Sequence, residues 1–287
     1  VNTAKALRQR IAVDGKAGDI FSFGGWGRGS ALPLENEGFG QRTFGMRVEV
    51  LEEKKEWVRV RTHYRYEGWV ERGRLFPEGE GTRDFDAAQK RILTKRCADL
   101  MREPRVQSSP RVSVPRGALL GVSGRTAENG WSEVILPNGS RAWTRTNYLA
   151  PHVTSAQGKD EAALRREIVQ AALPYLGAPY RWGGKSPLGI DCSGLCSMAY
   201  MLCGVLIYRD AKIVPGFPVH SIPFDRVQMG DLLFFPGHVG MYIRNGLFIH
   251  STSHEGDEGV VLASLTPGHP RYRGDLRETM TDCGSIF

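Results

Sequence analysis

The chain has 287 residues, 41% of them hydrophobic, and a net charge of +7, which is enough apolar content for several small domains. No stretch is apolar for the length that a membrane span requires. Basic residues occur in every part of the chain, which favours an acidic polymer or anionic fragment as partner over a nucleic acid. The five cysteines are an odd number without the spacing of a disulfide framework, so we expect no structural disulfide.

The first half of the chain contains an internal repeat with an offset of 74 residues. Trp57 and Trp69 recur as Trp131 and Trp143. The same offset relates four further apolar pairs, which are Val48 and Val122, Val60 and Val134, Leu75 and Leu149, and Pro77 and Pro151. Each copy reads as short alternating strands separated by polar turns, and these strands are residues 48–51, 57–61 and 68–70, then 119–122, 131–136 and 141–144. The repeat therefore predicts two small β-barrels with most tryptophans in their cores.

Both copies resemble bacterial SH3-like domains, in which a Trp-x-x-Val strand is followed by a Gly-Trp-Val strand and a closing leucine. The second copy departs mildly from this pattern, because Ala142 stands where the first copy has Gly68. We place the two domains at residues 1–80 and 84–153. A polar linker at 151–158 separates them from a third domain at 159–287.

The third domain begins with a predicted helix. Asp160 is its expected N-cap, and Gly177 with Pro179 ends it. The apolar residues within it recur at helical spacing and are Leu164, Ile168, Ala171, Ala172 and Tyr175.

Cys192 has the setting of a reactive cysteine. It follows a Gly-rich loop and precedes a run whose apolar residues, Leu195, Met198, Ala199 and Leu202, have helical spacing. At the first turn of a helix, free backbone N–H groups and the helix dipole favour a thiolate and can bind an oxyanion. Cys196 and Cys203 lie further along the same helix, where we expect them to be packed as small hydrophobic residues.

Two histidines lie on strands that form a predicted hairpin. His238 begins one short apolar strand, His250 ends the next, and Asn245-Gly246 between them is a hairpin signal. Antiparallel pairing would bring the start of the first strand beside the end of the second. We therefore expect the two histidines to touch.

These motifs resemble the NlpC family of bacterial cell-wall cysteine peptidases. The resemblance covers the last domain and rests on four motifs in order, which are Tyr180-Arg-Trp-Gly-Gly, Asp191-Cys-Ser-Gly-Leu, His238-Val-Gly and Phe248-Ile-His-Ser. It implies a multi-domain chain with two small all-β barrels followed by an α+β papain-like peptidase domain. It also implies that Cys192 is the nucleophile, His238 the general base and His250 the residue that orients it, with Tyr180 lining the oxyanion side of the cleft.

Tandem SH3-like domains before such a core resemble a narrower subfamily, the γ-D-glutamyl-L-diamino acid endopeptidases. Two stretches support the match, which are residues 184–193 and Tyr208-Arg-Asp-Ala. The resemblance assigns the substrate's free N-terminal ammonium to Asp210 and Ser193, and it adds Asp191 to the substrate-binding residues. Tyr66 of the first barrel is the expected tyrosine that closes the groove, with Tyr64 as the alternative.

The resulting hypothesis is a cysteine endopeptidase that cleaves the bond between γ-linked D-glutamate and a diamino acid through a thioester on Cys192. Its substrates would be peptidoglycan stem peptides with a free N-terminal L-alanine, such as L-Ala-γ-D-Glu-L-Lys or the diaminopimelate form, and no cofactor is implied. The alternatives are a broader hydrolase of intact cell wall, an acyltransferase or amidase on the same fold, and a wall-binding protein without turnover. Cys192, Cys196, His238 and His250 could also hold zinc, although this spacing is unusual for a structural zinc site.

The chain begins at Val1 without a methionine, which suggests a removed leader or a trimmed sequence. We expect the protein in the cell envelope or outside the cell, with recycling of fragments in the cytoplasm as the alternative.

Overall fold

The computed structural model describes residues 7–11, 44–62, 64–77, 79 and 82–287. The chain divides into two compact units, Val1–His152 and Val153–Phe287, so both repeats belong to one unit. The division lies at the start of the predicted linker.

The first repeat is a five-stranded antiparallel sheet. Its order is β4-β3-β2-β1-β5, so the last strand pairs with the first. The elements are β1 (Leu7–Ile11), β2 (Arg47–Lys54), β3 (Trp57–Thr62), β4 (Glu67–Glu71), a 3-10 turn (Arg72–Arg74) and β5 (Leu75–Pro77).

The second repeat is a seven-stranded sheet with the same underlying order. Four elements of the first repeat begin at residues 57, 67, 72 and 75, and their counterparts in the second begin at 131, 141, 146 and 149. The sequence repeat of 74 residues is therefore also a repeat of the structure. The order β12-β6-β9-β10-β11 matches the first repeat, and the β7-β8 hairpin extends it. Its elements are α1 (Arg83–Ala87), β6 (Gln89–Leu93), β7 (Cys97–Met101), β8 (Pro110–Pro115), β9 (Leu119–Ala127), β10 (Trp131–Ile135), β11 (Arg141–Arg145), a 3-10 turn (Thr146–Tyr148) and β12 (Leu149–Pro151).

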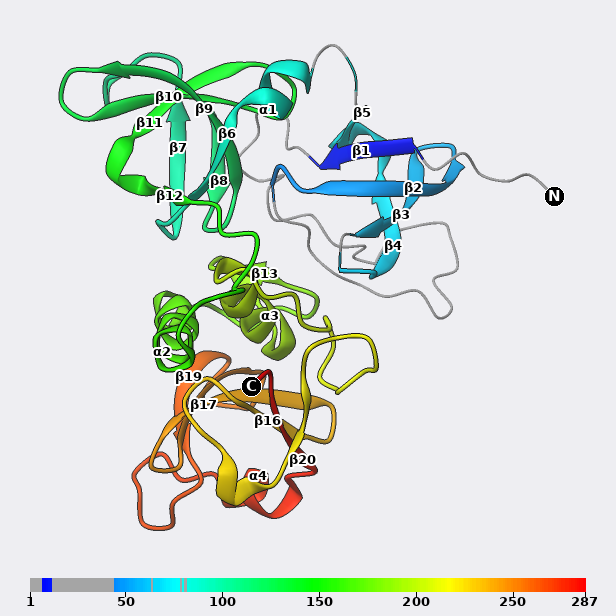
Figure 1. The fold of residues 1–287 in the computed structure, drawn as a ribbon, viewed down its shortest axis with the longest axis vertical. Coiled ribbons are helices and arrows are strands. Elements are labelled where there is room, and N and C mark those ends of the chain that lie inside the picture. Colours follow the sequence, from blue (N-terminus) through cyan, green and yellow to red (C-terminus); the bar gives the residue numbers. More distant parts are fainter. Residues whose placement is uncertain (1–6, 12–43, 63, 78, 80–81) are drawn as a thin grey trace. The chain divides into compact units, whose positions relative to one another are not determined.

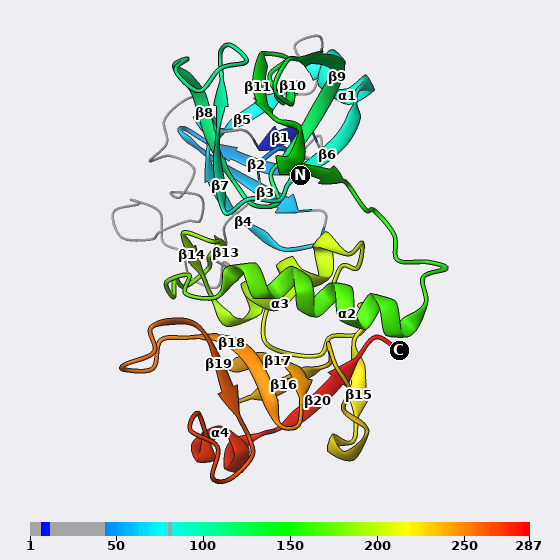
Figure 2. The same ribbon diagram turned by 90° about the vertical axis from the view of Figure 1, so that its left-hand side faces the viewer.

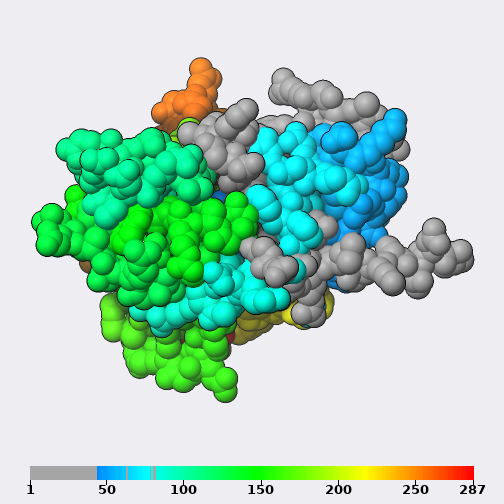
Figure 3. Space-filling model, turned by 90° about the horizontal axis from the view of Figure 1, so that it is seen from above, coloured from blue at the N-terminus to red at the C-terminus, as the bar shows by residue number. Residues whose placement is uncertain are grey.

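The two repeats share one hydrophobic core. Val58 and Val60 of the first and Leu100 and Val134 of the second belong to a single buried cluster, and Figure 3 shows the repeats side by side. At the junction the Leu119 N–H donates to the Phe44 carbonyl over 2.9 Å. The repeats therefore stabilise each other by burying apolar surface that neither would cover alone.

Only two of the four repeat tryptophans are core residues, which corrects the expectation that most of them are. Trp69 and Trp131 are buried, whereas Trp57 and Trp143 are half-buried. Trp57 and Trp143 occupy outward positions in the alternation of β3 and β11. The Arg125 guanidinium lies over the Trp143 ring, 5.7 Å from its centroid, so a charged side chain partly covers this outward-facing ring.

The second unit is a six-stranded sheet with helices on both faces. Helices α2 and α3 cover one face and the short α4 lies against the other (Figures 1 and 2). The sheet order is β15-β20-β16-β17-β18-β19, with a separate β13-β14 pair. The elements are α2 (Glu161–Ala172), a 3-10 turn (Leu173–Tyr175), β13 (Lys185–Ser186), β14 (Gly189–Ile190), α3 (Cys192–Leu202), β15 (His220–Ile222), a 3-10 turn (Phe224–Arg226), β16 (Leu232–Phe235), β17 (His238–Arg244), β18 (Leu247–Thr252), β19 (Gly259–Ser264), α4 (Gly274–Thr279) and β20 (Asp282–Ser285).

Helix α2 starts where the sequence predicts and ends earlier. The Asp160 carboxylate accepts from the Ala163 N–H over 2.8 Å, as an N-cap does. The α-helix ends at Ala172 instead of continuing to Gly177, and the chain goes on as a 3-10 turn that contains Pro174. Proline lacks the N–H that would continue the ladder, which explains the change.

The predicted hairpin between the histidines is present. Strands β17 and β18 pair antiparallel, and Asn245 and Gly246 both have positive φ, at 49° and 77°. Two such residues form the turn that matches the twist of the strands. A one-residue register shift between Tyr242 and Arg244 adjoins the turn, and the shifted pairing, Met241 with Ile249, places His238 and His250 on the same face of the sheet.

A buried ion pair joins α2 to the sheet. Arg165 Nη1 donates to Asp231 Oδ1 over 2.8 Å and to the Met229 carbonyl over 2.9 Å. Ser285 Oγ donates to the same Asp231 oxygen over 2.7 Å. The Asp231 side chain has no exposed surface, so the pair links helix, β16 and β20 where water does not screen it.

We predict that Asp231→Ala lowers the free energy of unfolding by about 3 kcal/mol, because it leaves the Arg165 charge buried without its carboxylate. Urea denaturation measures this change. Asp225→Ala, at an exposed aspartate, is the matched control, and equal losses in both variants would contradict the role of the buried pair.

Candidate active site

Cys192 is the first residue of α3, as the sequence predicts. Asp191 caps this helix, because its Oδ1 accepts from the Gly194 N–H over 2.6 Å. Its Oδ2 accepts from the Gly183 N–H over 2.7 Å, which ties the preceding loop to the same carboxylate. The helix start and the loop before it are thus held by one side chain, and Cys192 lies between them.

Arg209 completes this arrangement, and the sequence analysis did not identify it. Its Nη1 and Nη2 donate to the two oxygens of Asp191 over 3.0 and 2.8 Å. Nη1 also donates to Ser193 Oγ over 2.7 Å. Arg209 is among the largest fully buried side chains of the protein. The available signal was its place in the Tyr208-Arg-Asp motif, since a buried aspartate requires a cationic partner.

The structure gives Asp191 a role different from the predicted substrate contact. Both of its oxygens accept hydrogen bonds from the protein's own donors, namely Gly183, Gly194 and Arg209. We therefore assign Asp191 to capping α3 and to holding Arg209. Ser193 keeps capacity for a ligand, because its hydroxyl donates toward Asp191 over 3.3 Å and accepts from Arg209, which leaves a lone pair.

The thiol of Cys192 is buried and protonated at rest. Burial, and then the Asp191 carboxylate, raise its pKa to about 11. Hydrogen bonds from the backbone N–H groups of Val239 and Ser193 act in the opposite direction and favour the thiolate. The bond from Val239 places the sulfur beside the main chain of the residue that follows His238.

The two histidines meet as predicted. His238 Nε2 lies 2.8 Å from His250 Nδ1, within hydrogen-bond distance. The His238 ring stacks on Phe235 at 5.8 Å, and the His250 ring lies 4.9 Å from Phe248. A proton on His238 Nε2 that is donated to His250 leaves His238 Nδ1 as a free acceptor, which is the tautomer a general base needs.

Both histidines are neutral at physiological pH. Burial, followed by the charge of Arg273, lowers the pKa of His238 to about 4. Burial and the neighbouring His238 lower the pKa of His250 to about 3. The resting site is thus a neutral thiol with neutral imidazoles, so the thiol must lose its proton as it attacks.

Tyr180 belongs to the same site. Burial, followed by the charges of Cys192 and Asp191, raises the pKa of its hydroxyl to about 12. A phenol with this pKa remains protonated and can donate a hydrogen bond. The charge of Cys192 acts on this hydroxyl, and its place on the oxyanion side stays a prediction.

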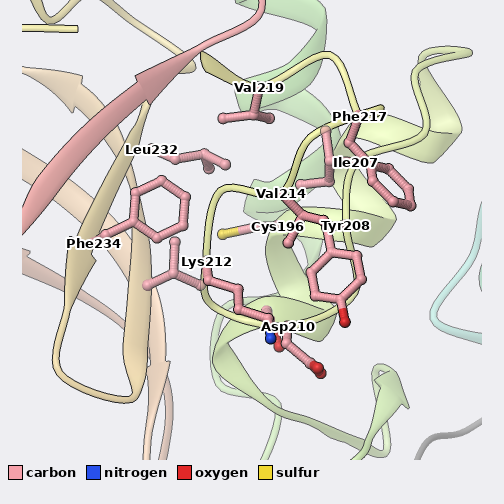
Figure 4. A pocket seen from close by; sticks show the side chains of 12 residues that line it. Cys196, Ile207, Tyr208, Asp210, Lys212, Val214, Phe217, Val219, Leu232 and Phe234 are labelled. Atoms are coloured by element: carbon pink, nitrogen blue, oxygen red, sulfur yellow. The ribbon is translucent and has the colours of Figure 1, made fainter. Parts of the chain in front are cut away.

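Figure 4 shows a pocket whose lining includes Ser193, the residue after Cys192, and Asp210. Asp210 and Lys212 lie at one end, and Val219 and Leu232 at the other. The remaining lining residues are mostly apolar and are Cys196, Ile207, Tyr208, Val214, Phe217, Phe234 and Val239. The pocket thus joins a charged end to an apolar end.

The structure gives no support to the zinc alternative. Cys196 lines the apolar part of the pocket, and no three His, Cys, Asp or Glu side chains in the described part of the chain form a group suited to a metal.

Tyr66, the tyrosine expected to close the groove, is half-buried, and the centroid of its ring lies 6.5 Å from that of Tyr64. It belongs to the other compact unit, so its contact with the cleft stays a prediction.

Comparison with known proteins identifies the family. Residues 177–270 match the model of the NlpC/P60 family, and residues 39–75 match the bacterial SH3 domain. The chain is 44% identical over 247 residues to dipeptidyl-peptidase 6 of Lysinibacillus sphaericus, which covers 85% of this chain and 90% of that protein. The chain belongs to the NlpC/P60 family. It is a cysteine peptidase of that family.

Other NlpC/P60 relatives also match across most of their length. The gamma-D-glutamyl-L-lysine dipeptidyl-peptidase of Bacillus subtilis is 31% identical, over 74% of this chain and 71% of that protein. A solved NlpC/P60 family protein from Bacillus cereus superposes with a TM-score of 0.68 at 26% identity, over 87% of this chain and 83% of that one. Within the described residues, no helix is long and apolar enough to cross a membrane.

We predict that Arg209→Lys lowers kcat/KM on L-Ala-γ-D-Glu-L-Lys on the order of 100-fold, because an ammonium cannot replace the bidentate pair that holds the start of α3. Steady-state hydrolysis measures it, with thermal unfolding to confirm that the variant is folded. Arg226→Lys, at an exposed arginine, should retain wild-type activity. Full activity in a folded Arg209→Lys enzyme would show that the bidentate pair of Arg209 with Asp191 is not needed for activity.

We also predict that acid destabilises the fold through the histidine pair. Their pKa values of about 4 and 3 lie below the ordinary 6.5, so the unfolded chain binds more protons below pH 6.5. The free energy of unfolding should therefore fall as the pH drops from 6.5 to about 4.

Urea unfolding at a series of pH values measures this slope. His250→Asn should flatten it, whereas His220→Asn, at an exposed histidine, should leave it unchanged. Equal slopes in the wild type and His250→Asn would exclude the pair as its source.

Proposed function

We propose that the enzyme hydrolyses the bond between γ-D-glutamate and the following diamino acid in peptidoglycan stem peptides that have a free N-terminal L-alanine. The names of two relatives support this substrate, since the Bacillus cereus and Bacillus subtilis proteins are called gamma-D-glutamyl-L-lysine dipeptidyl-peptidases. They are 28% and 31% identical to this chain.

The observation that carries the proposal is the pocket that joins Ser193 to Asp210. Ser193 directly follows the nucleophile and retains a lone pair for an N–H donor. Asp210 adds a half-buried carboxylate at the charged end of the same pocket. Together they offer two acceptors to a substrate ammonium close to the bond that Cys192 would attack.

This arrangement selects a substrate end. An acylated N-terminus has neither the charge nor the hydrogen-bond donors of an ammonium, so it would make weaker contacts with these two oxygen acceptors. The apolar end of the pocket, which includes Val219 and Leu232, suits a small apolar side chain such as that of alanine. The enzyme would thus cleave released stem peptides in preference to stems whose L-alanine is still acylated.

The neutral resting site defines the first chemical step. The sulfur of Cys192 attacks the γ-carbonyl carbon while its proton moves to His238 Nδ1, and His250 accepts the hydrogen bond from His238 Nε2. The Cys192 backbone N–H at the start of α3 and the Tyr180 hydroxyl donate to the oxyanion. The intermediate then breaks its C–N bond, and His238 gives its proton to the leaving amine.

The second step releases the acyl group. Water attacks the thioester carbon, His238 takes a proton from that water, and the sulfur leaves and recovers the proton. The products are the dipeptide L-Ala-D-Glu and a peptide or amino acid that begins with the diamino acid. No cofactor takes part in this sequence.

The non-catalytic repeats shape the substrate-binding end in this proposal. The second repeat has the strand order of the first, which supports a second SH3-like barrel although the SH3 family model matches only residues 39–75. Tyr66 of the first barrel would close the groove at the amine end, with Tyr64 as the alternative. The substrate is a cell-wall product, which supports action in the envelope or outside the cell, with the cytoplasm as the alternative.

The experiment is mass spectrometry of L-Ala-γ-D-Glu-L-Lys, its diaminopimelate form and the N-acetylated peptide after incubation with the enzyme. We expect cleavage of the free-amine peptides only. Cys192→Ala should abolish it, and Asp210→Asn should raise KM on the order of 10-fold by removing a charge-assisted bond.

Matched controls make each outcome decisive. Asp225→Asn changes an exposed aspartate and should not alter KM. Equal cleavage of free and acetylated peptides would favour a broader hydrolase that acts on intact wall. Cleavage of none would reject this substrate and favour another acyl substrate or a wall-binding role.

A further inference from the structure

The net charge of the chain is concentrated in the second repeat. Residues 82–152 contain 12 basic and 6 acidic residues, whereas the peptidase unit, residues 153–287, contains 12 basic and 13 acidic ones. Within the second repeat the excess is greatest between residues 95 and 116, which contain six basic residues and two acidic ones. This segment is the β7-β8 hairpin with its flanking residues. Most of the net charge of +7 therefore belongs to one repeat, and much of it to one hairpin.

The six basic residues follow this hairpin from one end to the other. In chain order they are Lys95, Arg96, Arg102, Arg105, Arg111 and Arg116, and we call them the basic strip. Arg96 and Arg116 lie at the open end, where the Arg116 N–H donates to the Arg96 carbonyl over 3.1 Å. Arg102 lies at the closed end, where its N–H donates to the Ser109 carbonyl over 3.1 Å. At the rise of a β-strand, the two ends are about 20 Å apart.

The acidic residues of the repeat compensate little of this charge. Glu103 pairs with Arg105 at 2.7 Å, and Asp99 accepts a hydrogen bond from the Ser113 hydroxyl. Three further acidic residues pair with arginines outside the basic strip, and these are Asp84, Asp86 and Glu133. The segment from residue 95 to 116 thus keeps a net charge of +4.

The basic strip lies on the surface along one edge of the sheet. Four of its members, Lys95, Arg96, Arg102 and Arg105, are exposed, and the other two are half-buried. In β8, Val112 and Val114 are buried, so Arg111 between them and the strand's start lies on the outward face. Strand β8 is the last strand at one edge of the seven-stranded sheet (Figure 2).

Protection of the edge strand explains only part of this charge. Edge strands use charged residues and prolines to prevent pairing with other chains. Strand β8 has both, since it contains Arg111 and both begins and ends with a proline. The basic residues at the two ends of the hairpin lie outside its strands, where they add nothing to that protection. Positive charges spread over about 20 Å fit an extended ligand with negative charges along its length.

We propose that the basic strip binds a linear anionic polymer of the cell wall with a phosphodiester in each repeat unit, and so keeps this cell-wall peptidase beside the wall. Five of its six members are arginines, whose planar guanidinium donates two parallel hydrogen bonds to phosphate oxygens. A strip of this length exceeds what a single phosphate can span. The role is separate from the peptidase site and from the choice of peptide substrate.

Two other anionic partners fit the basic strip less well. A membrane surface is bound with the help of apolar side chains that enter it, and Val106 is the one exposed large apolar residue in the described part of this repeat. Single-stranded nucleic acids stack their bases on aromatic side chains, and residues 95–116 contain no aromatic residue. A flexible phosphodiester chain without bases needs neither feature.

The test is binding of the full-length protein to fluorescently labelled poly(glycerol phosphate), measured by anisotropy at a series of salt concentrations. The variant Lys95→Gln/Arg96→Gln/Arg102→Gln replaces three exposed basic residues and should weaken binding on the order of 10-fold at low salt. Each contact with a flexible phosphodiester chain adds about 0.7 to the slope of log affinity against log salt, so this slope should fall by about 2.

The matched control is Arg166→Gln/Arg226→Gln/Arg244→Gln, which removes the same charge at exposed arginines of the peptidase unit. It should bind as the wild type does. Equal weakening in both variants, or no binding by the wild type, would overturn the proposal. If the first variant melts far below the wild type, Lys95→Gln/Arg102→Gln decides, with an expected fall in slope of about 1, and an unchanged slope there would overturn the proposal equally.

Three further probes distinguish the sources of negative charge. Tighter binding to double-stranded DNA than to the polymer would overturn the proposal in favour of a nucleic acid. Tighter binding to phosphatidylglycerol vesicles would overturn it in favour of a membrane surface. Binding of free glycerol phosphate as tight as that of the polymer would reject a polymer as the ligand. None of these measurements uses a peptide, so a failure of the proposed substrate would not affect them.

Discussion

The active site depends on one buried carboxylate. Asp191 caps α3, binds the preceding loop through Gly183, and pairs with both ends of the Arg209 guanidinium. A buried charge of this kind is costly unless every lone pair is satisfied, and here the protein supplies all the donors. Cys192 follows directly in the chain, so the position of the nucleophile is a consequence of how this carboxylate is satisfied. Ser193 receives its orientation from the same arginine.

Burial also decides the protonation of the catalytic groups. The thiol pKa rises to about 11 while those of the histidines fall to about 4 and 3. A preformed thiolate and imidazolium pair would be expensive in such surroundings, since each charge would lack solvation. The chemistry therefore couples deprotonation to attack. A substrate that excludes the remaining water would strengthen the N–H and O–H donors that face the oxyanion.

In the proposed function, the pocket lined by Ser193 and Asp210 makes a general nucleophile selective. Its polar residues come from α3 and from the loop after it, and its apolar wall comes largely from that loop and from β16. No single element contains the specificity. The segment from Ile207 to Val219 has no regular secondary structure, yet it contributes Arg209, which holds Asp191 and Ser193, and Asp210, which would bind the substrate ammonium in the proposed function. Neighbouring residues on one irregular segment thus link catalysis to recognition.

Much of the fold was readable from the sequence, because local patterns determine local structure. The 74-residue offset, the Asp160 cap, the helix that starts at Cys192 and the Asn245-Gly246 turn each depend on residues close together in the chain. The predicted strands correspond to real ones, and the two histidines meet through the hairpin together with the register shift between Tyr242 and Arg244, for which the sequence had no signal. Strands that pair with distant partners, such as β1, β15 and β20, had no local signal of that kind.

The remainder was decided by tertiary structure. The sequence by itself contains the family motifs, predicts Cys192 as the nucleophile and correctly predicts that His238 and His250 meet. Only the folded chain showed that Asp191 pairs with Arg209 and that two of the repeat tryptophans lie outward. Each of these facts depends on residues that are separated along the chain and come together only in the folded protein. Burial and electrostatic coupling depend on distance in space, and spacing along the chain does not encode that distance.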